Sequence, residues 1–81
     1  MKAIVNIYLK EGVLDPQGKA VHHALGSLGF REVEDVRVGK QIILKLRDGL
    51  SDQEAKEEVE QMCEKLLANT VIEDYDIELV R

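Results

Sequence analysis

The sequence predicts an α+β fold in which two helices cover one face of an antiparallel sheet. Two observations support this prediction: apolar and polar residues alternate in four short segments, and apolar residues recur at helical spacing in two longer ones. The chain has 81 residues and a mass of 9.1 kDa, with 44% hydrophobic and 33% charged residues. This size and composition predict a single domain over residues 1–81, with one small core.

The first part of the chain predicts a strand and then a helix. Residues 3–9 alternate apolar and polar side chains, which is the period of a strand. Asp15 and Pro16 favour a helix start, because aspartate accepts an N-cap hydrogen bond and proline needs no N–H donor at the first helical position. We expect this helix to end near Leu28, with Gly29 in the left-handed conformation.

Gly18 lies in the first turn of this predicted helix. A glycine inside a helix costs about 0.5–1 kcal/mol relative to alanine. Two interpretations remain open: another backbone passes close to Gly18, or the helix end simply tolerates a glycine.

A hairpin is predicted next. Residues 33–38 and 41–47 have strand patterns. The pair Gly39-Lys40 between them suits a two-residue type II′ turn. The two segments should therefore pair with each other in the sheet.

The last part of the chain predicts a second helix and a final strand. Ser51 and Glu54 have the spacing of a capping box, and Asn69 is a plausible helix stop. Residues 75–80 alternate again. The resulting β-α-β-β-α-β order predicts a ferredoxin-like sandwich. The apolar stripe of the second helix consists of Ala55, Val59, Met62, Cys63 and Leu66.

In such a sandwich one face of the sheet has no helix on it. That face would carry Ile4, Tyr8 and Ile43 among polar neighbours. A partly apolar sheet face is usually covered by another chain, and a symmetric homodimer is the commonest arrangement. We therefore expect self-association through these residues, as a dimer or a tetramer.

Charge is distributed unevenly. The net charge is −5, which argues against nucleic-acid binding, because phosphate neutralisation needs clustered Lys and Arg. Residues 1–50 hold eight basic and six acidic residues, a net of +2, whereas residues 51–81 hold three and ten, a net of −7. We predict that Glu57, Glu60 and Glu64 on the second helix meet basic groups of a partner. The alternative is a solvated helix surface.

No catalytic set emerges from the residue pattern. His22 and His23 are adjacent on a helix and point about 100° apart, so they do not form a metal-binding pair. Cys63 lies on an apolar stripe and is expected in the core. The stretch from Gly12 to Lys19 departs from a phosphate-binding loop in its spacing. The absence of a secretory or membrane-spanning pattern predicts a cytoplasmic protein with no membrane partner.

Several segments together resemble the PurS family, and the resemblance covers nearly the whole chain. Thr70 departs from the family pattern, because many members have proline there, and this affects only the helix-to-strand connection. The matching segments are Leu9–Val21 (LKEGVLDPQGKAV), Val36–Lys40 (VRVGK), Leu66–Tyr75 (LLANTVIEDY) and Ile77–Leu79 (IEL).

The resemblance implies the small, non-catalytic subunit of phosphoribosylformylglycinamidine synthase in purine biosynthesis. In that system a PurL-type subunit uses ATP and Mg to activate its substrate, a PurQ-type subunit releases ammonia from glutamine, and PurS-like chains self-associate and link the two. No catalytic residue and no bound cofactor or metal are expected on this chain. The expected partner contacts are Lys10, Gly12, Asp15 and Gly18 in the first loop, Arg37 and Lys40 in the hairpin, and the acidic side of the second helix.

A second class of function shares the β-α-β-β-α-β order. Regulatory modules of the ACT type bind amino acids at dimer interfaces, and the stretch from Gly12 to Gly18 is where such a ligand would lie. An ACT-like module should be stabilised by a specific free amino acid, whereas an assembly subunit should respond to its protein partners.

Overall fold

The computed structural model describes residues 1–81 and shows an α+β fold, as predicted. Its elements are β1 (Lys2–Leu9), α1 (Pro16–Ser27), β2 (Lys40–Lys45), α2 (Asp52–Met62), η1 (Cys63–Leu67) and β3 (Glu73–Val80). The three strands form one antiparallel sheet in the order β2-β1-β3. Both neighbours of β1 therefore come from later parts of the chain.

The core lies between the sheet and α2. Ala3, Val5 and Ile7 of β1 are almost fully buried, and they alternate with residues that face the other side. Val59 and Cys63 pack against them, so the predicted core position of Cys63 is confirmed. The predicted capping box is also present: the Glu54 N–H donates to Ser51 Oγ over 3.1 Å, and the Ser51 N–H donates to Glu54 Oε1 over 3.2 Å.

The end of the second helix differs from the prediction that its apolar stripe continues to Leu66. The last turn, η1, is a π-helix, closed by a 3.0 Å hydrogen bond from the Ala68 N–H to the Cys63 carbonyl. A π-turn takes more residues per turn than an α-helix, so it rotates the residues that follow. Leu66 is consequently 82% exposed instead of lying in the core, whereas Leu67 packs against the core.

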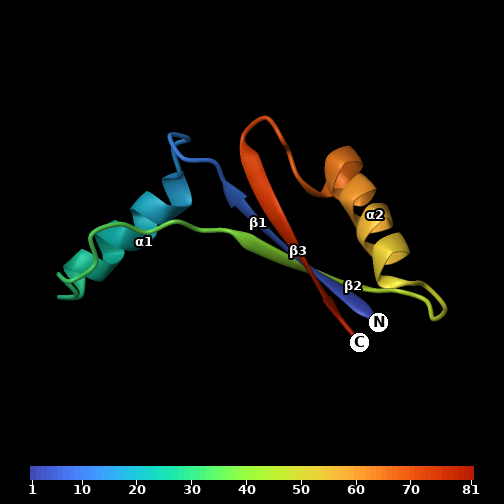
Figure 1. Ribbon diagram of the computed structural model, residues 1–81. Helices are drawn as coiled ribbons and strands as arrows, with labels where there is room; N and C mark the ends of the chain where they lie inside the picture. Colours follow the sequence, from blue (N-terminus) through green and yellow to red (C-terminus); the bar gives the residue numbers. More distant parts are fainter.

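The predicted strand at residues 33–38 is wrong. These residues have no strand partner and form an extended strap, residues 30–39, that runs beside α1 (Figure 1). The Val38 N–H donates to Asp15 Oδ2 over 2.7 Å and is therefore engaged outside the sheet. Gly39 is not part of a hairpin turn either. A Cβ there would lie 2.7 Å from the Ile7 carbonyl oxygen, so glycine is needed where the strap crosses β1.

Only one of the two helices covers the sheet. Figure 1 shows α1 and α2 on opposite sides of the strands, with α1 joined to them by extended segments. The approach of α2 to the sheet is closest along β3, and α1 forms no comparable contact with any strand or with α2. The expectation that α1 and α2 share one face is therefore wrong within a single chain, which extends over 51 × 26 × 14 Å.

Gly18 is explained by a close approach of another backbone. A Cβ at this position would collide with the Val36 carbonyl oxygen and lie 2.9 Å from Asp15 Oδ2. Of the two interpretations of Gly18, the structure supports the first. The strap can run this close to α1 only where the helix has no side chain.

Replacing Gly18 and Gly26 by alanine should change stability in opposite directions. Gly18→Ala should lower the free energy of unfolding by about 1–3 kcal/mol, because the strap must move away from the new methyl group. Gly26→Ala is the matched control in the same helix, where a Cβ meets nothing within 4 Å. It should raise stability by up to about 1 kcal/mol through helix propensity. Denaturant unfolding followed by circular dichroism measures both, and equal effects would contradict the assigned contact.

Candidate functional site

The predicted site residues fall on three separate surfaces. One is a cluster at the start of α1, called here the α1 base: Lys10, Gly12, Asp15, Gly18, Arg37 and Lys40. The second, the acidic groove, lies on α2 and η1 and includes Glu57, Glu60 and Glu64. The third is the open sheet face, with Ile4, Tyr8 and Ile43. The structure thus joins the first loop to the segment containing Arg37 and Lys40, although that segment is not a hairpin.

Asp15 is the centre of the α1 base. Its side chain is only 5% exposed. Its carboxylate accepts hydrogen bonds from the Val38 N–H over 2.7 Å and from the Gly18 N–H over 2.9 Å. These two backbone donors, with the Val38 N–H as the stronger influence, hold the pKa of Asp15 below its ordinary value. One carboxylate therefore caps α1 and fastens the strap to it.

Arg37 holds the loop between β1 and α1. Its Nη1 donates to the Val13 carbonyl over 2.9 Å and its Nη2 to the Lys10 carbonyl over 3.3 Å. Gly12 has φ of +83° within this loop, a conformation that favours glycine. The guanidinium thus takes the place of water as the hydrogen-bond donor to these loop carbonyls, and it fixes the loop to the strap.

The two lysines of the α1 base reach β3. Lys10 Nζ lies 2.8 Å from Asp74 Oδ1, and Lys40 Nζ lies 3.9 Å from Glu73 Oε2. Lys40, Glu73 and Asp15 line a shallow cleft of about 310 Å³ between β1 and the start of α1. The α1 base therefore presents paired charges around a cleft, with both lysine side chains still partly exposed.

The acidic groove is formed by one side of α2 and η1 together with β3. Its lining includes Glu57, Glu60, Glu64 and Tyr75. Burial, followed by the nearby charge of Glu64, raises the pKa of Tyr75, so its hydroxyl keeps its proton and can donate. The predicted acidic residues thus share one surface, which is suited to a cationic side chain.

The open sheet face combines a polar ladder with apolar residues. Gln41 Nε2 donates to Asn6 Oδ1 over 3.0 Å, and Asn6 Nδ2 donates to Asp76 Oδ1 over 2.9 Å. Ile4 and Ile43 are paired across neighbouring strands, and Ile43 is 55% exposed. The predicted face is therefore present and uncovered in the single chain.

Sequence reasoning missed a fourth surface. The Lys10 N–H donates to the Ile72 carbonyl over 2.9 Å, which brings the first loop beside the turn before β3. Leu14, Val71 and Ile72 are all exposed on these two segments. The apolar pair Val71-Ile72, in the turn that follows Asn69, could have indicated this surface, because turn residues are normally polar.

Neither histidine nor the cysteine forms a reactive set. His22 is half-buried, with its Nε2 2.8 Å from the Val33 carbonyl oxygen, and His23 is exposed. Burial, with smaller contributions from Glu64 and Glu60, raises the pKa of the Cys63 thiol. No three His, Cys, Asp or Glu side chains are grouped as metal ligands. Neither α1 nor α2 has the length and apolar run that a membrane span requires.

Comparison with known proteins gives a consistent result. The family model "PurS: Phosphoribosylformylglycinamidine (FGAM) synthase" matches residues 2–81. The chain is 55% identical over 78 residues to the phosphoribosylformylglycinamidine synthase subunit PurS of Bacillus subtilis, covering 96% of this chain and 90% of that protein. It is 49% identical to the corresponding subunit of Methanocaldococcus jannaschii, covering 96% and 93%.

Solved structures show the same likeness. A crystal structure of Bacillus subtilis PurS superposes with a TM-score of 0.87 at 54% identity, covering 99% of this chain and 98% of that one. A chain in the structure of PurLQS from Thermotoga maritima superposes with a TM-score of 0.87 at 29% identity, covering 98% and 95%. The likeness therefore extends to a subunit within an assembled complex.

Asp15 should hold the strap at all pH values above its ordinary pKa of 3.8 and release it in acid. Because its folded-state pKa is lowered, the folded protein binds fewer protons than the unfolded chain there, so acid weakens the attachment. The amide chemical shifts of Gly18 and Val38, followed against pH, should titrate together with a midpoint below 3.8.

Asp15→Asn is the control for this titration, because an amide has no acid proton in this range. In that variant the two amide shifts should stay constant with pH. A wild-type midpoint at or above the ordinary value would contradict the role given to Asp15.

Proposed function

The chain belongs to the PurS family, and on this premise we propose how it serves as a subunit of phosphoribosylformylglycinamidine synthase in purine biosynthesis. It is a non-catalytic assembly subunit that contacts an ATP-using PurL-type synthetase subunit and a PurQ-type glutaminase subunit. The likeness to a chain in the PurLQS structure is the observation that carries this proposal. ATP, Mg and glutamine are used by the partner subunits in the cytoplasm, and this chain binds none of them.

The perturbed groups of the chain support a structural task. Asp15 and Glu54 have lowered pKa values because backbone N–H groups donate to them, and both cap helices. Cys63 is buried and keeps its proton. These are the contacts of a rigid scaffold, whereas a catalytic acid, base or nucleophile needs a perturbed group in contact with substrate.

A bridging subunit increases the rate of coupled turnover by fixing the relative positions of the two active sites. Ammonia released at a glutaminase site is protonated or diluted once it reaches solvent, so the two active sites must be held in register. Binding one partner raises the effective concentration of the other only if the two contact surfaces are separate and rigidly joined. The α1 base and the acidic groove lie next to different helices, α1 and α2, which Figure 1 shows on either side of the strands.

We assign three contact surfaces on these grounds. The α1 base and the acidic groove contact the two partner subunits, and the acidic groove meets basic groups. The open sheet face, with its exposed Ile43 and Tyr8, contributes to self-association. Each of these surfaces combines exposed side chains with a backbone that is fixed by hydrogen bonds, which limits the entropy lost on binding.

Omitting this subunit should separate two activities of the synthase. Glutamine-dependent turnover by the PurL-type and PurQ-type subunits from the same source should require this chain. Turnover with added ammonia in place of glutamine should not, because no transfer between active sites is then needed. If neither activity changes, the assembly role is wrong, and a screen for stabilisation by free amino acids would test the ACT-like alternative.

Reversing the charge of the acidic groove should weaken assembly. Glu57→Lys, Glu60→Lys and Glu64→Lys together should raise the subunit concentration needed for half-maximal glutamine-dependent turnover by at least about tenfold, which corresponds to about 1.4 kcal/mol. The matched control reverses Glu32, Glu34 and Asp48, three exposed acidic residues outside the acidic groove, for the same change in net charge. Equal effects of both variants would show that only net charge matters.

A further inference from the structure

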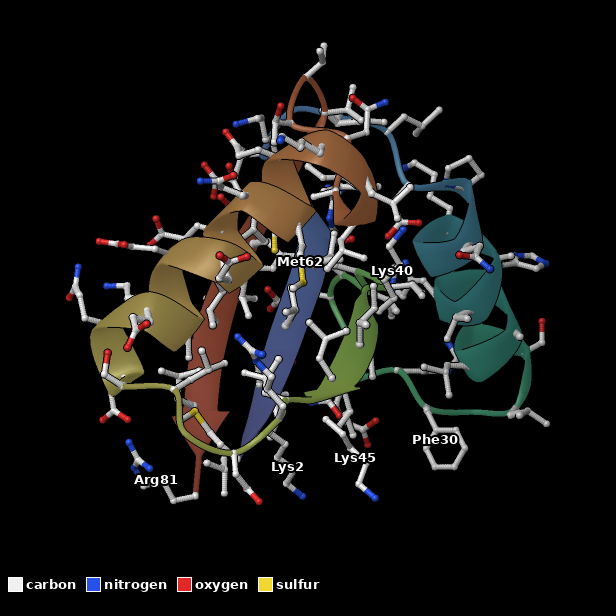
Figure 2. The ribbon with its side chains drawn as sticks, turned by 90° about the vertical axis from the view of Figure 1, so that its right-hand side faces the viewer. Lys2, Phe30, Lys40, Lys45, Met62 and Arg81 are labelled. Atoms are coloured by element: carbon white, nitrogen blue, oxygen red, sulfur yellow. The ribbon has the colours of Figure 1, made fainter.

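Strand β3 has one edge that no other strand of its own chain covers. The order β2-β1-β3 places β3 at one side of the sheet, and Figure 2 shows it there in faint red, with α2 passing in front of it. An uncovered edge presents unpaired N–H and C=O groups and can bind a further strand. The eight residues of β3, Glu73–Val80, are long enough for such pairing.

The register of the sheet shows which backbone groups of β3 face outward. Opposite residues of an antiparallel pair alternate between hydrogen-bonded and non-hydrogen-bonded pairs. The Lys10 N–H donates to the Ile72 carbonyl over 2.9 Å, one position beyond the Leu9–Glu73 pair. Counting from there, β1 bonds the backbone of every second residue of β3, namely Asp74, Asp76 and Glu78. The residues between them have N–H and C=O groups that point away from β1: Tyr75, Ile77 and Leu79.

Acidic side chains flank this edge on both faces of the sheet. The open sheet face has three exposed acidic residues on β3: Asp74, Asp76 and Glu78. The α2 side has the three of the acidic groove, a hollow of about 410 Å³ that Tyr75 also lines: Glu57, Glu60 and Glu64. Of these six carboxylates only that of Asp74 forms an ion pair, with Lys10. The edge therefore lies in a negative potential, which favours a basic occupant.

The edge of a second β3 strand does not fit here. If two β3 strands paired side by side with their apolar faces together, acidic residues would lie opposite one another, as Asp76 opposite Glu78. Like charges directly opposite one another destabilise a sheet. Charged residues on an edge strand commonly prevent such pairing. The same charges attract a strand of opposite charge.

We propose that a partner subunit adds a strand to the edge of β3, and that the side chains of this strand alternate between basic and apolar residues. Its backbone pairs with the outward groups of Tyr75, Ile77 and Leu79. Its basic side chains face Asp76 and Glu78 on the open sheet face. Its apolar side chains extend the partly buried row of Ile77 and Leu79, beside the acidic groove. This inference rests on the proposed assembly role and specifies how a basic segment binds.

Hydrogen exchange in the assembled synthase tests this pairing directly. The chain is measured alone and in complex with the PurL-type and PurQ-type subunits, by mass spectrometry with fragmentation to single residues. The N–H groups of Tyr75, Ile77 and Leu79 should exchange at least about tenfold more slowly in the complex, because the added strand supplies their acceptors. The N–H groups of Asp76 and Glu78 are the internal control, because β1 already protects them in the chain alone.

A synthetic peptide tests whether the edge selects the alternating pattern. The probe is acetyl-Lys-Val-Lys-Val-Lys-Val-Lys-amide, added to the chain without its partners. It should slow the exchange of the three outward N–H groups of β3. Two matched peptides should not: acetyl-Lys-Lys-Lys-Lys-Val-Val-Val-amide, which has the same composition without alternation, and the alternating peptide with Glu in place of Lys. Equal protection by the first of these would overturn the proposal, because charge alone would then explain binding.

A charge reversal on the open sheet face tests the side-chain contacts. Glu78→Lys should raise the Kd of the alternating peptide by about threefold, because it places like charges opposite one another. Glu34→Lys makes the same change in net charge on the strap, away from β3, and is the matched control. Equal effects of the two variants would contradict the register proposed for the added strand.

The outcomes separate this inference from the proposed function. If glutamine-dependent turnover requires this chain, but the outward N–H groups of β3 exchange equally fast with and without the partners, strand addition is overturned and the assembly role stands. If these N–H groups already exchange slowly in the chain alone, a second copy covers the edge, and the inference is overturned as well. Slow exchange in the complex only, together with selection of the alternating peptide, supports it.

Discussion

The carboxylate of Asp15 directs the chain between the first two strands. It accepts hydrogen bonds from the first turn of α1 and from Val38, so the strap follows the helix and leaves the sheet. With the strap engaged there, β2 begins only at Lys40, and the sheet has three strands. Gly18 and Gly39 permit this course, because each lies where a Cβ would meet a backbone carbonyl. The elongated shape of the chain follows from this one buried group.

The remaining stability comes from a small core on one side of the sheet. Val5, Ile7 and Val59 are its largest members and are fully buried, or nearly so. The π-turn after α2 lets Cys63 and Leu67 both reach this core, and it turns Leu66 outward. The chain then returns through Asn69, whose carbonyl accepts from the N–H groups of Ile72 and Glu73. Thr70 is the second residue of this turn, a position that accepts threonine as well as proline.

The parts of the fold that depend on local patterns were predictable from the sequence. The Asp15 N-cap, the Ser51–Glu54 capping box and the alternation in β1 each rest on residues close together in the chain. The strap was not predictable, because its valines have the pattern of a strand. Whether they pair or not depends on Asp15, which lies 23 residues before its hydrogen-bond partner Val38. The exposure of Leu66 was not predictable for a related reason: the spacing of apolar residues does not reveal a π-turn.

The candidate surfaces, like the fold, were predictable where they depend on local sequence and not where they depend on distant contacts. Lys10, Arg37 and Lys40 could be assigned to contact segments, but their internal bonds to loop carbonyls and to β3 required the structure. Arg37 in particular positions a loop, because its guanidinium binds the carbonyls of Val13 and Lys10. The sequence does not distinguish a side chain that is bound to two carbonyl oxygens from a side chain that has no partner.

The position of α1 outside its own core joins folding to assembly. Part of the apolar surface that an 81-residue chain would otherwise bury within itself is exposed on α1, and it becomes stabilising only when another molecule covers it. Stability of such a chain therefore depends on concentration. If the α1 base and the acidic groove each contact a partner subunit, as proposed above, the two partners are held in fixed register only if α1 is itself fixed. Whatever covers the apolar side of α1 therefore also sets the distance between the two surfaces.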